Sequence, residues 1–305
     1  MSVLIGGGTG FVGRHLTKLL AENGLKVTVV SRAAGPNKIT WSDLQRTGLP
    51  DGITAVVSMS GENILNPMKR WNESFKQAVW SSRVDCTQSL ANAICQATNP
   101  PKVLVSMSGV GYYKPDPTAE YDEDSPGGDF DYLSELCTAW EAAAKLPSSV
   151  SCRQAIVRSG VVLGRDGGMI QQIYWPFFLG AGGRIGSGAQ WFPWVHVADV
   201  AGIITHAIIN DHVSGVLNAV APEPATNAEF TKAFASAMWR PSIFPVPGFV
   251  MNTVYGPERG KVILEGQKVI PKKTLESGYK FAFPDLKSAC QDVSQMLTIT
   301  SVSGS

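Results

Sequence analysis

Two patterns of hydrophobic spacing occur within the first 32 residues. Residues 2–6 form a short apolar run that is typical of a buried strand. A helical stripe with spacing i, i+4, i+7, i+8 follows, and it consists of Val12, Leu16, Leu19 and Leu20. Gly24 ends this helix, and residues 26–30 begin a second apolar run. The pattern predicts strand, glycine turn, helix and strand in that order.

The same alternation continues through the first half of the chain. Apolar runs predict strands at 53–59, 102–106, 152–163 and 216–220. Helical spacing predicts helices at 73–97, 132–146 and 196–210. Strands that alternate with helices indicate an α/β fold with a doubly wound parallel sheet, the Rossmann arrangement.

The composition of the sequence changes after residue 163, where glycine-rich and tryptophan-rich segments begin. Thr226 and Glu229 form a capping box that opens a further helix. We therefore expect a Rossmann domain at 1–163, with its sheet completed by about 195–221. Residues 164–194 and 222–298 are expected to form a smaller C-terminal α+β lobe. That lobe is expected to overhang the carboxyl ends of the strands, where open α/β sheets bind ligands.

The turn after the first strand carries the spacing Gly7-x-x-Gly10-x-x-Gly13. Glycines allow a tight turn and a close approach of the main chain to a pyrophosphate. The N-terminus of the following helix presents free N–H groups and a positive dipole end to that anion. Because strand, glycine turn and helix occur together, the segment predicts a dinucleotide site.

The end of the second strand indicates which dinucleotide binds. NAD-binding proteins usually place a carboxylate there for the ribose 2′-hydroxyl, but this chain has Ser31 and Arg32, with no acidic residue before Asp43. An arginine suits a 2′-phosphate, and such a charge-assisted contact changes affinity by roughly 10- to 100-fold. We therefore expect NADP(H) as the cofactor. The alternative is that Arg32 is an ordinary surface residue.

Composition restricts the classes of protein to which the chain can belong. It has 305 residues, of which 44% are hydrophobic and 17% charged, and its net charge of +1 favours neither nucleic acid nor an anionic membrane. No apolar run approaches the roughly 18 residues that span a bilayer, and the first strand leaves no room for a leader. Five scattered cysteines and four histidines without metal-ligand spacing predict reduced thiols and no metal. We expect an intracellular, soluble protein, most simply cytoplasmic, although an organelle is not excluded.

Several motifs together resemble the extended short-chain dehydrogenase/reductase superfamily. They are Gly7 to Gly13, Val57 to Gly61, Ser106 to Ser108, Arg158 to Gly164, and Val195 to Val200. Ser82-Arg83-Val84, Trp140 to Ala144, and the segment from Leu264 through Leu286 are similar to the atypical epimerase-family proteins related to nucleoside-diphosphate-sugar epimerases.

The resemblance implies a set of cofactor contacts. The glycine loop would hold the pyrophosphate, Ser31 and Arg32 the 2′-phosphate, and the loop after the strand at 53–59 the adenosine and ribose. The residues implied are Gly7, Thr9, Gly10, Phe11, Val12, Gly13, Ser31, Arg32, Ser58, Met59, Gln77, Ser82 and Gly160. For Gln77 and Ser82, the alternative of polar residues on a helix surface stays open.

The chain departs from the superfamily at its catalytic pair, Tyr-x-x-x-Lys. Tyr132 is followed four residues later by Leu136, and alignment on Glu141 places Leu133 and Cys137 at the two positions. The tyrosine of that pair acts as an acid/base because a lysine and the cofactor lower its pKa. Without the lysine, the catalytic residues are unknown.

For the other candidate functional residues, a structural role is at least as well supported as a functional one. Ser108 and Tyr113 are possible proton donors, but we expect Tyr113 to pack in the core. His196 is expected to be structural, and Asp199 to lie in the first turn of a helix. The aromatic residues Trp191, Phe192 and Trp194 are expected in the core or at a substrate pocket. Residues 120–124 are expected to form a solvated acidic loop.

Two classes of function are consistent with these features. The first is an NADP(H)-dependent oxidoreductase acting on an unknown small molecule, with a sugar-nucleotide epimerase as a less favoured variant, since it normally needs the same tyrosine. The second is a catalytically silent protein that senses NADP(H). Neither the substrate nor the oligomeric state is assigned.

Overall fold

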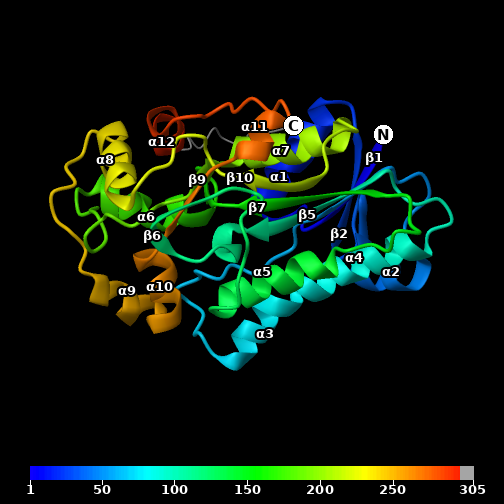
Figure 1. The fold of residues 1–305 in the computed structure, drawn as a ribbon, viewed down its shortest axis with the longest axis horizontal. Helices are drawn as coiled ribbons and strands as arrows, with labels where there is room; N and C mark the ends of the chain where they lie inside the picture. The colour runs from blue at the N-terminus through cyan, green and yellow to red at the C-terminus, as the bar shows by residue number, and fades with distance from the viewer. Residues whose placement is uncertain (296–305) are drawn as a thin grey trace, which may run out of the picture.

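A seven-stranded parallel sheet forms the centre of the computed structural model, which describes residues 1–295 (Figure 1). The strand order is β10-β7-β5-β4-β1-β2-β3. The strands are β1 (Ser2–Gly6), β2 (Lys26–Ser31), β3 (Lys38–Thr40), β4 (Ala55–Ser58), β5 (Val103–Gly109), β7 (Arg153–Ser159) and β10 (Gly215–Ala219). The order runs outward from β1 in both directions, so the direction of winding changes between β1 and β4. This confirms the predicted doubly wound sheet, and ligands bind at such a switch point in open α/β sheets.

Helices cover both faces of the sheet because its strands are apolar on both sides. They are α1 (Phe11–Glu22), α2 (Trp41–Thr47), α3 (Glu73–Ser81), α4 (Val84–Gln96), α5 (Tyr132–Ala143) and α7 (Val197–Ile209). Val3 and Ile5 pack with α1 and α7, whereas Leu4 packs with α2 and α4 on the opposite face. This alternation of side chains along β1 is the pleat of a strand buried between two helical layers.

The helix predicted at 73–97 is two helices instead of one. It breaks between α3 and α4 at Ser82 and Arg83. Ser82 Oγ donates to the carbonyl of Val79 at 2.9 Å and accepts the N–H of Glu62 at 2.9 Å. A serine that bonds to nearby main chain competes with helical continuation, so this position ends α3.

The smaller C-terminal lobe predicted from the sequence is present (Figure 1). Its helices α6 (Gly168–Phe178), α8 (Asn227–Ala237), α9 (Gly248–Tyr255), α10 (Pro257–Leu264) and α12 (Leu286–Ser294) lie beyond one end of the sheet, whereas α11 (Lys272–Glu276) packs against β10. Its strand pairs join β8 (Val161–Leu163) to β9 (Trp194–His196), and β6 (Asp116–Tyr121) to β11 (Gln267–Val269). The exact boundaries expected for the lobe stay a prediction, and residues 296–298 lie outside the described part.

The buried carboxylate of Asp199 fastens residues 279–283 to the Rossmann domain. Asp199 lies in the first turn of α7 as expected, but it is fully buried. It accepts hydrogen bonds from the Tyr279 hydroxyl at 2.9 Å and from the N–H groups of Ala282 and Phe283 at 2.7 and 3.0 Å. The segment 279–283 is therefore held against α7 of the first domain.

The acidic segment 120–124 is only in part the solvated loop expected from the sequence. Its first two residues belong to β6, and Glu123 is 5% exposed. The Glu123 carboxylate accepts the N–H groups of Asn218 and Lys273, each at 3.0 Å. The prediction failed because these partners come from distant parts of the chain. Among the described residues, no helix has the length and hydropathy needed to cross a bilayer.

Candidate cofactor site

Three loops meet at the carboxyl edge of the sheet around β1. The strand register aligns Gly6 with Val30 of β2 and with Ser58 of β4. Consequently Gly7, Ser31 and Met59 each come directly after one of these three aligned residues. The N–H of Met59 donates to the carbonyl of Gly6 at 2.9 Å, which fixes the third loop against the first. The sequence therefore folds the glycine loop, the Ser31–Arg32 pair and the Met59 loop into one place.

The glycines of the loop have different local roles. Gly7 has φ +90°, and a Cβ there would lie 2.7 Å from the main chain of Met59. A Cβ on Gly13 would lie 2.3 Å from the carbonyl oxygen of Gly7, so this glycine lets α1 pack onto the turn. A Cβ on Gly10 would meet only the oxygen of Gly7, at 3.2 Å, and Gly10 is exposed. Gly10 therefore leaves open the approach to the start of α1.

The first turn of α1 has no acceptor of its own. Its N-cap is Gly10, which has no side chain, and the first turn contains no acidic residue. N–H groups at such a helix start are available to an anionic ligand. Thr9 is exposed beside them.

Phe11 and Val12 belong to this first turn but face the protein. Val12 packs against the core on the α1 side of the sheet. The Phe11 ring packs against the main chain of the turn before α6, since a Cβ on Gly164 or Gly167 would lie within 2.6 Å of it. The glycine-rich segment at 164–168 is thus explained by close packing on Phe11.

Ser31 and Arg32 occupy the positions expected for selection of the dinucleotide. The Ser31 hydroxyl hydrogen-bonds within its own turn, to the main chain of Ala33. The Arg32 side chain is exposed and forms no ion pair with a residue in the described range 1–295. Its guanidinium is therefore free to pair with a ligand phosphate.

Ser58 does not lie on the surface of its loop as expected. It is the last residue of β4 and is fully buried. Its hydroxyl forms a 2.7 Å hydrogen bond with Thr87 Oγ1, which also accepts the indole N–H of Trp140. Ser58 therefore joins β4 to α4, and Met59, which is partly exposed, is the residue of this pair that reaches the site.

The last three expected contacts have clear structural roles of their own. Gln77 is exposed on α3 and donates to Ser81 at 3.1 Å, whereas Ser82 forms the junction between α3 and α4. A Cβ on Gly160 would lie 2.4 Å from the carbonyl oxygen of Pro193, so Gly160 permits the pairing of β8 with β9. Contact between these residues and a cofactor stays a prediction.

The region where the superfamily places its catalytic groups contains a buried ion pair. Arg158 donates from Nε and Nη2 to the two carboxylate oxygens of Glu141, at 2.8 and 2.9 Å. Ser108 Oγ donates to Glu141 at 2.8 Å, and Arg158 Nη1 donates to the fully buried Tyr113 hydroxyl at 2.9 Å. Burial opposes the charge of Arg158, but the hydrogen bonds and charge of Glu141 raise its pKa overall. Ser108 and Tyr113 therefore hold the core together, and Tyr113 is buried as expected.

The remaining candidates for proton transfer are poorly suited to it. The Tyr132 hydroxyl donates to the carbonyl of Lys76 at 2.7 Å, and burial raises the pKa of Tyr132 to about 12. Burial also raises the pKa of the Cys137 thiol to about 11. A group that serves as an acid/base needs a pKa near the working pH, so neither side chain replaces the missing pair.

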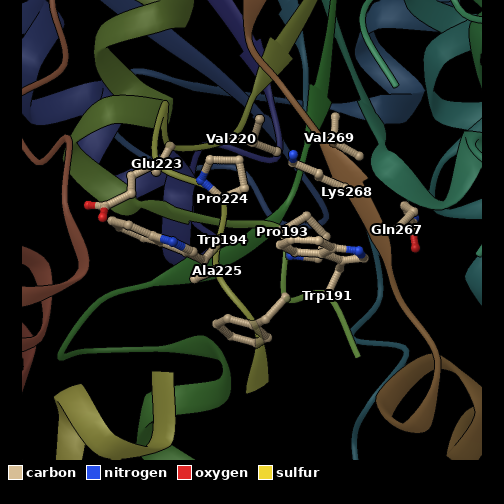
Figure 2. Close-up of a pocket in the computed structure, with 12 residues that line it drawn as sticks. Trp191, Pro193, Trp194, Val220, Glu223, Pro224, Ala225, Gln267, Lys268 and Val269 are labelled. Atoms are coloured by element: carbon tan, nitrogen blue, oxygen red, sulfur yellow. The ribbon is translucent and has the colours of Figure 1, made fainter. Parts of the chain in front are cut away.

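The aromatic segment 191–194 is divided between core and surface. Trp194 is 1% exposed, whereas Trp191 lines a small hollow between β9, β11 and the end of β10 (Figure 2). The Nζ of Lys268 lies 5.3 Å from the centre of the Trp191 ring, and the Trp191 indole donates to the carbonyl of Pro117 at 2.9 Å. This hollow lies near the β10 edge of the sheet, with β7, β5 and β4 between β10 and β1.

The paired roles of Glu141 and Arg158 were missed from the sequence. Both were recognised as parts of motifs, but not as partners. Each is a charged residue with apolar neighbours in the sequence, Glu141 before Ala142 and Ala143 in α5 and Arg158 after Ile156 and Val157 in β7. Because buried charges are almost always paired, two opposite charges in such surroundings were a signal that could have identified the contact.

Comparisons with known proteins agree with this geometry. Residues 3–219 match the model of the NAD dependent epimerase/dehydratase family, and residues 246–293 match a domain of unknown function, DUF1731. The chain is 55% identical to the human epimerase family protein SDR39U1 over 293 residues, which covers 96% of this chain and 99% of the human one.

Two solved structures are informative. A crystal structure of human SDR39U1 (isoform 2) with NADPH is 55% identical, with a TM-score of 0.94, and the match covers 96% of this chain and 99% of that one. The nucleoside-diphosphate sugar epimerase from Corynebacterium glutamicum is 30% identical, with a TM-score of 0.77, over 96% of this chain and 58% of that one.

Proposed function

The chain belongs to the NAD dependent epimerase/dehydratase family, and from this premise we propose that it binds NADP(H) and acts as an oxidoreductase on a small molecule. One observation carries the proposal. The glycine loop, the exposed Arg32 and the Met59 loop lie together at the switch point of the sheet. An anionic dinucleotide fits this combination of free helix N–H groups and a free guanidinium.

The choice of NADP(H) over NAD(H) is supported by two independent facts. Arg32 stands where a carboxylate would select NAD, and it has no protein partner within the described residues. The human relative, which is 55% identical, was crystallised with NADPH. When bound, the cofactor would supply a hydride, while Gly7 to Gly13 and Arg32 would position it.

A second candidate function is a protein that senses NADP(H) without turnover. The fixed hydrogen bonds of Ser108 and Tyr113, together with the raised pKa values of Tyr132 and Cys137, favour it. A sugar-nucleotide epimerase is less favoured, because epimerisation normally uses the same absent tyrosine. That the ligand is a small molecule, without nucleic acid or membrane, is part of the proposal, as is an intracellular location.

A coupled binding and turnover measurement tests the proposal. The fluorescence of NADPH is titrated with wild-type protein and with Gly10→Val protein, and both are then incubated with a fractionated metabolite extract and NADPH or NADP⁺. We expect wild-type binding and a change in reduced-nicotinamide absorbance, both absent in the variant. Binding without turnover in any fraction would favour the sensor, and absence of NADPH binding would refute both functions.

A further inference from the structure

The guanidinium of Arg83 lies close to the main chain at Gly61 and to the ring of Trp140. A Cβ on Gly61 would lie 2.9 Å from Cζ of Arg83 and 3.0 Å from Nη2, so the glycine permits this close approach. Cζ is 5.3 Å from the centre of the Trp140 ring. Gly61 directly continues the Met59–Ser60 segment that packs against Gly7, so Arg83 borders the cofactor site.

Arg83 forms no ion pair with any carboxylate of the described residues, and Glu62 acts on its charge only at longer range. The side chain has five N–H donors, and only those on Nη1 are used, toward the Val79 carbonyl at 3.2 Å and Ser82 Oγ at 3.4 Å. In the described chain, Nε and Nη2 donate to no acceptor, and no carboxylate forms an ion pair with Arg83. Burial lowers the pKa of Arg83, which shows that its surroundings disfavour the charge. A partly buried cation without an ion-pair partner is costly to keep.

Two other buried arginines show how this protein normally satisfies such a group. Arg158 pairs with Glu141 and also bonds to Tyr113. Arg259 donates to the main-chain carbonyls of Tyr255, Ile64, Asn66 and Lys69. Arg83 differs from both because three of its five N–H donors are unused, next to the 59–61 segment that packs against the glycine loop.

The location of Arg83 relates it to the missing catalytic lysine. Alignment on Glu141 places Cys137 at the lysine position of α5, and this thiol is buried and neutral. Cys137 and Tyr132 lie near Arg83, but burial raises their pKa values to about 11 and about 12, so neither supplies a negative charge near neutral pH. With Cys137 at the lysine position, α5 contributes no positive charge to this region. Arg83, at the junction of α3 and α4, contributes a positive charge instead.

We propose that Arg83 is an anion-binding residue of this site, which supplies the positive charge that α5 lacks at Cys137 and binds a phosphate or carboxylate oxygen of a ligand. This inference deepens the proposed function and rests on it for the location of the ligand. A planar guanidinium with free Nε and Nη2 groups suits either anion, because a phosphate and a carboxylate can each accept two parallel hydrogen bonds from these groups. The source is a phosphate of NADP(H) or a carboxylate of the second substrate.

The experiment compares wild-type protein with Arg83→Gln, Arg83→Lys and, as a matched control, Arg46→Gln. Arg46 is an exposed arginine on α2 that pairs only with Asp43. Thermal shifts are measured with NADPH, inorganic phosphate and malonate, the last two with and without NADPH, at ionic strength held constant with NaCl. Arg83→Gln should lose at least about tenfold in apparent affinity for one of these probes, as expected for a charge-assisted contact. Arg83→Lys should retain part of it, and Arg46→Gln all of it.

The pattern of losses identifies the source of the anion. Loss of NADPH affinity indicates a cofactor phosphate. Loss of the malonate or phosphate response with NADPH affinity unchanged indicates an anionic group of the second ligand. If wild type failed to bind NADPH, the proposed cofactor function would be refuted, yet the responses to phosphate and malonate alone would still decide the role of Arg83.

Stability of the ligand-free protein separates binding from a structural role. Removal of a partly buried charge that has no ion-pair partner should leave the Tm of Arg83→Gln unchanged or higher. A lower Tm with every probe response unchanged would mean that Arg83 serves only to bond the Val79 carbonyl, and it would overturn the inference. Wild-type protein that responds to none of the three probes would also overturn it.

Discussion

Arg158 and Glu141 form a bidentate ion pair that joins β7 to α5, with donor–acceptor distances of 2.8 and 2.9 Å. The side chains are 4% and 13% exposed. Because each charge satisfies the other away from water, removal of one partner leaves the second uncompensated in the core.

We therefore expect Glu141→Gln to lower the free energy of unfolding by about 3 kcal/mol, at the lower end of what loss of a buried partner costs. Urea denaturation followed by circular dichroism measures the change. Glu135→Gln is the matched control, since Glu135 is exposed on the same helix, and its effect should stay below about 1 kcal/mol. Equal effects of the two substitutions would contradict a stabilising role for the pair. The double change Glu141→Leu with Arg158→Met should recover most of the loss.

The periodicity of the sequence was sufficient to predict the sheet and the glycine loop. Buried parallel strands are apolar along their length, and α1 has a clear helical stripe, so both are visible without tertiary information. The break between α3 and α4 was not predicted, because it depends on a hydrogen bond that Ser82 Oγ accepts from the N–H of Glu62 in a different loop. Local patterns do not reveal partners that are distant in sequence.

The same limit applies to the site. The positions of Gly10 and Arg32 follow from strand order and were predicted. Ser58 was expected to reach the cofactor, yet it bonds to Thr87, 29 residues away. Glu123 looked like one of several solvated acids, but its partners lie about 95 and 150 residues further along the chain. Burial of a polar side chain is decided by these distant partners, and one sequence does not show them.

Substitution by alanine should have different effects at Gly10, the N-cap of α1, and at Gly13 in its first turn. A Cβ on Gly13 would lie 2.3 Å from the Gly7 oxygen, so Gly13→Ala should destabilise the fold by about 1–3 kcal/mol. Gly10→Ala should change stability by less than about 1 kcal/mol, since Gly10 has φ −72° and an exposed position, but it should weaken NADPH binding. Thermal unfolding and NADPH titration of both variants give the comparison. Unchanged NADPH affinity in Gly10→Ala would place the dinucleotide elsewhere.

Replacement of Arg32 should alter the choice of cofactor without affecting the fold. Arg32→Asp removes the partner of the 2′-phosphate and adds repulsion, so the ratio of NADPH to NADH affinity should fall by at least about 10- to 100-fold. Lys26→Asp is the matched control, because Lys26 is exposed at the opposite, amino end of the same strand. Titration of both cofactors against wild type and the two variants measures the ratio. The same ratio in Arg32→Asp and wild type would show that Arg32 is only a surface residue.

His196 should make stability depend on pH in a definite range. It is 5% exposed, its Nδ1 accepts the N–H of Ala198 at 3.2 Å, and its Nε2 lies 3.2 Å from a carboxylate oxygen of Asp292. Burial lowers the pKa of His196 below 6.5, although Asp292 opposes the shift. The unfolded chain therefore binds more protons just below pH 6.5, and the free energy of unfolding should fall as the pH drops below that value. This decrease should continue until the pH passes the lower pKa of the folded protein.

His196→Asn isolates this contribution, because asparagine keeps an acceptor at the start of α7 but does not titrate in this range. The free energy of unfolding of the variant should be less dependent on pH than that of wild type between pH 5 and 6.5, roughly the range in which an unperturbed histidine titrates. Arg165, acting against burial, lowers the pKa of Asp292, so loss of stability from that carboxyl begins near pH 3.8 and does not overlap this range. Urea titrations at a series of pH values test the difference. Parallel curves for the two proteins would show that His196 has the same proton affinity in the folded and unfolded states.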